Sequence, residues 1–225
     1  MKQIQLKICG MKYSENIQAI AELQPDYLGF IFWENSKRRF DLEEIPHFDS
    51  KIKKLGVFVD SSMNEITARK NQFDLNVIQL HGNETAAFCA KLKEQNVEVI
   101  KAFSISNDFN FNVLKQYISC VDYFLFDTKG RLPGGNGITF DWKILGDYSF
   151  QTPYLLSGGI GTTELDAIKI FLETEAGKNC IAIDVNSRFE LKSGYKNENK
   201  LRKFKKIKYQ QIICKICLLN IGSMV

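Results

Sequence analysis

Short apolar runs alternate with amphipathic stretches along most of the chain. Each run is four to six residues long and rich in Ile, Val, Phe and Tyr, which is typical of parallel strands buried on both faces. The runs are Ile4–Cys9, Tyr27–Phe32, Lys54–Val59, Val77–Leu80, Val97–Ala102, Tyr123–Phe126, Pro153–Leu156 and Cys180–Val185. We therefore predict eight strands.

Helical patterns separate these runs, at Ser14–Leu23, Ser62–Phe73, Glu84–Gln95 and Thr163–Glu173. Ser14, Ser62 and Thr163 stand where N-cap residues are expected. Eight strands alternating with helical segments predict an α/β fold of one domain, a closed (β/α)8 or TIM barrel. The structural alternative is a doubly wound open sheet, but no GxGxxG follows the first strand.

We assign residues 1–208 to the barrel, and we predict no interdomain linker within it. The Gly- and Pro-rich stretch at 132–137 is short and follows a strand, so we expect a loop of the barrel there. Residues 209–225 contain an apolar cluster and form a separate tail. The pattern leaves an extra helix, a tail packed on the barrel and an irregular terminus open.

Composition indicates a globular protein with a core, because 44% of the residues are hydrophobic and 25% are charged. The net charge is +4, but eight basic residues and one acid between Lys192 and Lys208 give that segment +7 and the rest −3. Such a run is usually a solvated helix face and less often a nucleic-acid or lipid patch. We therefore expect no nucleic-acid partner.

The N-terminal residues alternate like a strand and do not form the apolar core of a signal peptide. No stretch approaches the roughly 18 consecutive apolar residues of a membrane span, so we expect no membrane partner. Six cysteines lie without a framework spacing, which favours reduced thiols in a cytoplasm. Cys214 and Cys217 form a lone CxxC far from both histidines, and we expect no metal site there.

Polar, ionisable and glycine residues gather where the predicted strands end. In barrels of this kind, the active site forms at the carboxyl ends of the strands. These positions are Cys9-Gly10, Ser36–Arg39, Asp60, His81-Gly82, Asp127, Ser157–Gly159 and Asp184–Ser187.

Two of these strand ends predict a phosphate site. Gly158 and Gly159 follow the seventh strand and precede a helix, so backbone N–H groups can approach a phosphate closely. Asp184, Asn186 and Ser187 follow the eighth strand, and barrels often bind phosphate between these two loops. Plain turns are the alternative reading.

Cys9 and Asp127 are the candidate proton-transfer pair. Cys9 ends the first strand and is either a buried structural thiol or a base whose pKa is lowered by a nearby cation. Lys7 lies two residues earlier and points to the same side of the strand. Asp127 is either an N-cap or ion-pair partner or a general acid whose pKa is raised in a dry site.

Seven stretches together resemble phosphoribosylanthranilate isomerases, barrel enzymes of tryptophan biosynthesis. They follow the order of that family between residue 4 and about 205. The matching stretches are LKICGMK at 6–12, LGFIFWENSKR at 28–38, LGVFVD at 55–60, IQLHGNE at 78–84, FDT at 126–128, LSGGI at 156–160 and IDVNS at 183–187.

The resemblance implies an intramolecular aldose–ketose isomerase that performs an Amadori rearrangement. N-(5-phosphoribosyl)anthranilate becomes 1-(2-carboxyphenylamino)-1-deoxyribulose 5-phosphate, without cofactor or metal. Asp127 would protonate the ring oxygen, Cys9 would remove the C2′ proton, and Arg38 would bind the anthranilate carboxylate. His81 would orient groups at the barrel mouth, although a structural role for His81 and a surface role for Arg38 stay open. We expect a monomer or a homodimer.

The chain departs from the family pattern in two of these loops. Lys37 replaces a proline before Arg38, and Arg188 replaces a glycine after Ser187. Arg188 therefore adds a Cβ to a loop that is expected to approach phosphate, while the N–H of Ser187 remains a donor. Two rival readings are another phosphate-binding barrel enzyme and a non-catalytic protein that binds RNA through the Lys192–Lys208 segment.

Overall fold

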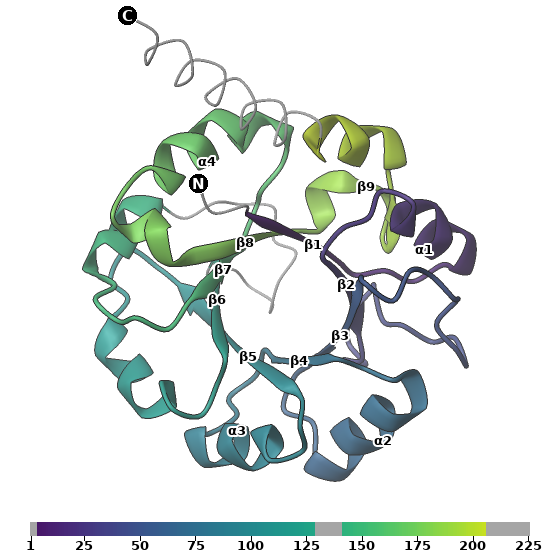
Figure 1. The fold of residues 1–225 in the computed structure, drawn as a ribbon, viewed down its shortest axis with the longest axis horizontal. Helices are drawn as coiled ribbons and strands as arrows, with labels where there is room; N and C mark the ends of the chain where they lie inside the picture. The colour runs from purple at the N-terminus through teal and green to yellow at the C-terminus, as the bar shows by residue number, and fades with distance from the viewer. Residues whose placement is uncertain (1–3, 129–140, 206–225) are drawn as a thin grey trace, which may run out of the picture.

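The computed structural model describes residues 4–128 and 141–205, and eight parallel strands close into a barrel (Figure 1). Each strand pairs with the next in sequence, and β8 pairs with β1. The strands are β1 Gln5–Cys9, β2 Tyr27–Ile31, β3 Lys53–Phe58, β4 Val77–Leu80, β5 Glu98–Ile105, β6 Tyr123–Thr128, β7 Tyr154–Leu156 and β8 Cys180–Val185. This confirms the predicted barrel and excludes the doubly wound sheet.

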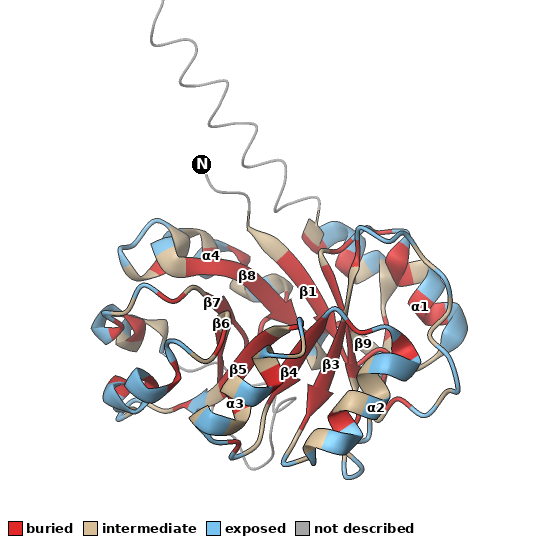
Figure 2. Cartoon of the chain, turned by 60° about the horizontal axis from the view of Figure 1, so that its bottom comes forward, coloured by how far each residue is buried: buried red, intermediate tan, exposed pale blue. Residues whose placement is uncertain are grey.

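Alternation along the strands divides the apolar side chains into two buried clusters. The smaller cluster fills the inside of the barrel and includes Cys9, Leu125 and Ala182. Because side chains two residues apart share a face, Lys7 also points inward on β1, as do Asp127 on β6 and Asp184 on β8. The larger cluster lies between the strands and the surrounding layer of helices. Figure 2 shows the buried strands at the centre and exposed residues on the outer helices.

Four α-helices stand on the outer layer, α1 Ser14–Ala21, α2 Met63–Phe73, α3 Ala86–Lys93 and α4 Leu165–Leu172, and residues 198–205 are also helical. The prediction of Ser62 as an N-cap is confirmed, because its side chain accepts a hydrogen bond from the Glu65 N–H. The predictions for Ser14 and Thr163 are wrong. Tyr13 occupies the N-cap position of α1, and Thr163 lies inside the 3-10 turn η3 Thr162–Glu164 that precedes α4.

Helices do not follow every strand, so the prediction of strict alternation is wrong in places. Residues 32–52, all within the described part of the chain, form no helix, and aromatic contacts cover the outer face of the barrel there. Phe40 packs against Phe30, Phe32 and Phe73 with ring centroids 5.0, 6.0 and 5.4 Å apart. Elsewhere the connections contain the 3-10 segments η1 Phe111–Tyr117, η2 Trp142–Asp147 and η4 Ala176–Asn179.

A small hairpin lies between β8 and the helix at 198–205. After the 3-10 turn η5 Ser187–Phe189, strands β9 Glu190–Lys192 and β10 Tyr195–Lys196 pair antiparallel. Asn16 of α1 holds the hairpin, because it accepts a hydrogen bond from the Lys196 N–H at 2.7 Å and donates one to the Lys196 carbonyl at 3.0 Å. The hairpin at 190–196 is therefore anchored to α1 and does not form a loose loop.

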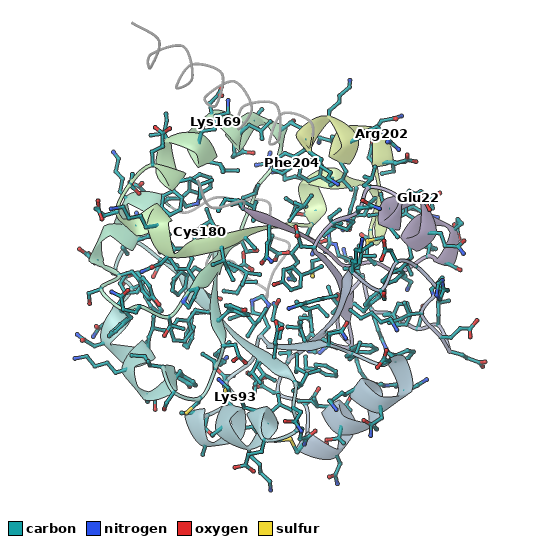
Figure 3. All side chains as sticks on the ribbon, in the orientation of Figure 1. Glu22, Lys93, Lys169, Cys180, Arg202 and Phe204 are labelled. Atoms are coloured by element: carbon teal, nitrogen blue, oxygen red, sulfur yellow. The ribbon has the colours of Figure 1, made fainter. Side chains whose placement is uncertain are left out.

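The described basic residues after Lys192 differ in exposure: Lys196 is buried, whereas Arg202 and Lys203 are exposed, as predicted for a solvated helix face. The Lys196 side chain is fully buried, Lys200 donates to the Arg188 carbonyl, and Arg202 pairs with Glu198. Figure 3 shows Arg202 and Lys169 extending from the outer layer while side chains fill the centre of the barrel. The residues at 132–137 and 209–225, with the CxxC of Cys214, lie outside the described residues. Within the described ranges, no helix is long and apolar enough to cross a membrane.

Candidate active site

A cavity of about 310 Å³ opens at the carboxyl ends of the strands. Its lining comes from β1, β2, β3, β4, β6 and β8 and from the segments that follow β2, β3, β4, β7 and β8. All nine site residues predicted from the sequence line it, namely Cys9, Arg38, His81, Asp127, Gly158, Gly159, Asp184, Asn186 and Ser187. Asp60 lies just after β3, but its carboxylate accepts a hydrogen bond from the Asn83 N–H and does not line this cavity.

The Cys9 thiol is buried, with 4% of the residue exposed. Gly29 lies beside it on β2, where a Cβ would come within 2.9 Å of Cys9 Sγ. Burial raises the pKa of the Cys9 thiol, and the neighbouring Lys7 only partly offsets this effect. The predicted cation is therefore present, but the prediction of a lowered pKa is wrong because desolvation is the larger effect.

The Lys7 ammonium group contacts two buried polar side chains, Asp184 and Gln79. Its Nζ lies 3.0 Å from Asp184 Oδ1 and donates a hydrogen bond to Gln79 Oε1 at 2.8 Å. Asp184 also accepts a hydrogen bond from the Ser157 hydroxyl at 3.0 Å. A buried cation with these partners stays charged, and its ion pair with Asp184 raises the pKa of Lys7 despite full burial.

This network also assigns the tautomer of His81. Because Gln79 Oε1 accepts from Lys7, the amide nitrogen of Gln79 faces His81 Nδ1, at 3.3 Å. Nδ1 is then the acceptor, and the ring proton sits on Nε2, which lies 3.7 Å from Asp127 Oδ2. Burial and the charges of Lys7 and Lys101 lower the pKa of His81 to about 3, so the ring is neutral at physiological pH.

The Asp127 carboxyl group holds its proton more strongly than an ordinary aspartate. Burial and the negative charge of Asp184 raise the pKa of Asp127 to about 6, although the N–H of Thr128 donates to its carboxylate at 2.9 Å. The prediction of a raised pKa in a dry site is confirmed. A thiol and a protonatable carboxyl group thus share one cavity. Such a pair can act as general base and general acid and move a proton between two atoms of a bound substrate.

The two loops of the predicted phosphate site lie together at the cavity. Gly158 and Gly159 have φ values of +93° and +63°, which glycine adopts without strain. Ser187 and Arg188 line the cavity with them. A Cβ at Gly161 would lie 3.3 Å from Arg188 Cβ, so the loop after β8 packs directly against the one after β7. Arg188 therefore borders both loops of the predicted phosphate site.

We expect Gly158→Ala to destabilise the fold by about 3 kcal/mol, because it combines backbone strain with a steric clash. A Cβ at this position would lie 2.2 Å from Thr128 Oγ1 and 2.6 Å from the Thr128 backbone nitrogen. Gly146→Ala is the matched control, since nothing lies within 4 Å of its added Cβ. Chemical denaturation of both variants checks this. Equal stability of the two variants would contradict the strain at Gly158.

Sequence reasoning missed three residues that fix the site. Gln79 and Lys196 are buried polar residues, and Glu190 holds Arg38 through two hydrogen bonds of 2.8 Å. Gln79 carried a signal, because it is a polar residue two positions before His81 in an otherwise apolar strand. Glu190 and Lys196 lie on the hairpin after β8, and only the fold brings them to Arg38.

The family model described as "N-(5'phosphoribosyl)anthranilate (PRA) isomerase" matches residues 6–207. The chain belongs to this family. Curated relatives named N-(5'-phosphoribosyl)anthranilate isomerase support the assignment. One from Parabacteroides distasonis is 39% identical over 204 residues, covering 88% of this chain and 90% of the relative. Another, from Campylobacter jejuni, is 38% identical over 208 residues and covers 90% and 98% of the two chains.

Solved structures of the family share the fold. The phosphoribosylanthranilate isomerase of Thermotoga maritima matches with a TM-score of 0.75 and 27% identity, covering 91% of this chain and 98% of that one. A second isomerase structure, in complex with reduced 1-(o-carboxyphenylamino)-1-deoxyribulose 5-phosphate, matches with a TM-score of 0.72 and 25% identity over the same shares. The resemblance noted in the sequence thus extends to the whole barrel.

Proposed function

We propose that this chain isomerises N-(5'-phosphoribosyl)anthranilate to 1-(2-carboxyphenylamino)-1-deoxyribulose 5-phosphate, a step of tryptophan biosynthesis. Membership in the family supports the reaction. The observation that carries the catalytic assignment is the pairing of a buried thiol and a carboxyl group of raised pKa in one cavity. We assign general acid–base chemistry to these two groups.

Asp127 acts as the acid in this proposal. It donates its proton to the furanose ring oxygen, the C1′–O bond breaks, and the lone pair on the anthranilate nitrogen forms an open-chain Schiff base. A pKa of about 6 suits this role, because the proton is still available near neutral pH and is transferred easily. His81 supports the acid, since its neutral ring directs the Nε2 proton towards the carboxylate that forms.

Cys9 acts as the base. As a thiolate, it removes the proton from C2′, the electron pair moves into the C1′–C2′ bond, and the resulting enolamine tautomerises to the ketone. Burial disfavours the thiolate, so the charge of Lys7 matters as a neighbour that favours the anion. Lys196 is also a cation whose charge lowers the pKa of Cys9.

The remaining predicted residues divide into two binding subsites. Gly158, Gly159, Asn186 and Ser187 surround the phosphate position, where backbone N–H groups serve as donors. Arg38 binds the carboxylate of the anthranilate ring, because a guanidinium matches a planar carboxylate with two hydrogen bonds. Asp184 acts through Lys7 and Ser157 and does not need to touch the substrate.

The pH dependence of kcat/KM follows from the two pKa shifts. The active form needs protonated Asp127 and deprotonated Cys9, and its fraction is constant between the pKa of Asp127, about 6, and the raised pKa of Cys9. Below pH 6, protonation of both groups removes the base; above the pKa of Cys9, ionisation of both removes the acid. We expect a lower limb centred near pH 6 and an upper limb above the ordinary thiol value of 9.0. Rates across pH 5 to 10 measure this, and an upper limb below pH 8 would contradict the assignment.

Turnover of the substrate is the direct test of the function. Purified protein is mixed with N-(5'-phosphoribosyl)anthranilate, and the loss of substrate fluorescence is followed. A folded protein without turnover would favour the rival, a barrel enzyme acting on another phosphorylated compound. The RNA-binding alternative predicts binding that weakens steeply with salt and is indifferent to changes at Cys9.

We also propose that the protein acts in the cytoplasm, as a monomer or a homodimer. A dimeric phosphoribosylanthranilate isomerase is known from Thermotoga maritima. Light scattering coupled to size-exclusion chromatography measures the mass directly, against the 25.8 kDa of one chain.

A further inference from the structure

The guanidinium of Arg38 is bound on one edge before any substrate arrives. Its Nε donates to Glu190 Oε1 and its Nη2 donates to Glu190 Oε2, each at 2.8 Å. The Arg38 side chain is 17% exposed and that of Glu190 is 7% exposed. Two short hydrogen bonds between nearly buried ions fix the plane of the guanidinium and not only its position.

Glu190 is itself held by the hairpin that carries it. Its Oε1 accepts hydrogen bonds from Lys196 Nζ at 2.8 Å and from the Gly194 N–H at 3.0 Å. Lys196 Nζ also donates to Asn186 Oδ1 at 2.6 Å, which ties the hairpin to the loop after β8. The carboxylate is therefore a fixed anchor and not a mobile surface acid.

A guanidinium has two edges that can bind a carboxylate with two hydrogen bonds. Glu190 takes the edge formed by Nε and one Nη2 proton, which leaves the edge formed by Nη1 and the other Nη2 proton. Arg38 lines the cavity that Cys9 and Asp127 share. We propose that Glu190 is a positioning residue that orients Arg38 so that this second edge receives the carboxylate of the substrate.

This inference rests on the proposed function, which assigns the aryl carboxylate to Arg38. It adds that the site recognises that carboxylate through an arginine whose orientation is fixed in advance. Pre-orientation reduces the conformational entropy that binding would otherwise cost. Glu190 also reduces the local positive charge. Arg38, Lys196 and Glu190 together carry a net charge of +1, whereas Arg38 and Lys196 without Glu190 would carry +2.

The charge balance makes Glu190→Gln a decisive variant. The substitution keeps the shape of the side chain, removes its negative charge, and replaces one of the two acceptors by an NH2 group. If Glu190 only weakened the local positive potential, Glu190→Gln would bind the anionic substrate more tightly. If Glu190 orients Arg38, we expect KM for the substrate to rise roughly 10- to 100-fold with kcat changed much less, because a ground-state contact is lost.

Inorganic phosphate serves as the probe for the other subsite. We expect it to inhibit competitively by binding to the loops after β7 and β8, with an inhibition constant that changes less than about 2-fold in Glu190→Gln. Glu198→Gln is the matched control, since Glu198 pairs with Arg202 on the outer helix and lies outside the cavity. Melting temperatures of both variants establish that they are folded.

A double-variant cycle separates positioning from general support of the fold. In an Arg38→Ala background, we expect Glu190→Ala to cause little further loss of kcat/KM, because Glu190 acts through Arg38. An equal loss in both backgrounds, an unchanged or lower KM in Glu190→Gln, or a parallel rise in the inhibition constant of phosphate would each overturn the inference. A wild-type protein that does not turn over the substrate would instead overturn the proposed function.

Discussion

Replacing Cys9 by alanine is expected to lower kcat by roughly 10²–10⁴-fold, the usual contribution of a general base. The substitution removes the atom that accepts the C2′ proton and leaves the phosphate and carboxylate subsites intact. KM should therefore change little. Single-turnover and steady-state measurements with N-(5'-phosphoribosyl)anthranilate give both parameters.

The control for Cys9→Ala is Cys89→Ala. Cys89 is also a buried thiol with a raised pKa, but it lies on α3 and outside the cavity. We expect this variant to lose a little stability and to keep its kcat. Normal turnover by a folded Cys9→Ala protein would remove Cys9 from the mechanism.

The barrel was predictable because its strands are buried on both faces. Runs such as Val77–Leu80 and Cys180–Val185 contain one strongly polar residue each, Gln79 and Asp184, and the structure places strands at these residues. The segments between the strands were less predictable. Where aromatic side chains cover the barrel in place of a helix, the sequence has no helical periodicity that would reveal the packing. Phe40 is an example: it is buried between β2 and α2, yet the chain around it is irregular.

The members of the site were predictable because the topology places all strand ends at one mouth. The inward direction of Asp127 and Asp184 follows from alternation, since each shares a strand face with an interior apolar residue, Leu125 or Ala182. The protonation states of these residues were harder to predict from the sequence. The sign of the shift at Cys9 depends on whether burial or Lys7 is the larger effect, and only the folded environment decides that.

Contacts between the hairpin and Arg38 could not be predicted from the sequence. Arg38 and Glu190 are 152 positions apart, and no periodicity links a loop after β2 to a hairpin after β8. The family pattern drew attention to Arg188 in this region, where the glycine is replaced. The structure shows that the same stretch also supplies Glu190, which binds the Arg38 guanidinium.

Replacing Asp127 by asparagine is expected to change activity and stability in opposite directions. The amide cannot donate the proton that opens the furanose ring, so we expect kcat to fall by roughly 10²–10⁴-fold. The hydrogen bond from the Thr128 N–H can still be accepted by the amide oxygen. Loss of activity should therefore not reflect a loss of the local fold.

The stability gain in Asp127→Asn follows from the raised pKa. The folded protein holds this proton up to about pH 6, whereas the unfolded chain releases it near 3.8. A carboxyl group whose pKa is raised by folding destabilises the folded state at high pH, because its ionised form is then buried. A difference of this size corresponds to a cost on the order of 3 kcal/mol above pH 6, and the neutral amide avoids it.

We expect Asp127→Asn to melt several degrees above wild type at pH 8 and to lose most of this advantage at pH 4.5. Thermal melts at the two pH values measure the effect. A stability difference between Asp127→Asn and wild type that does not depend on pH would contradict the raised pKa of Asp127.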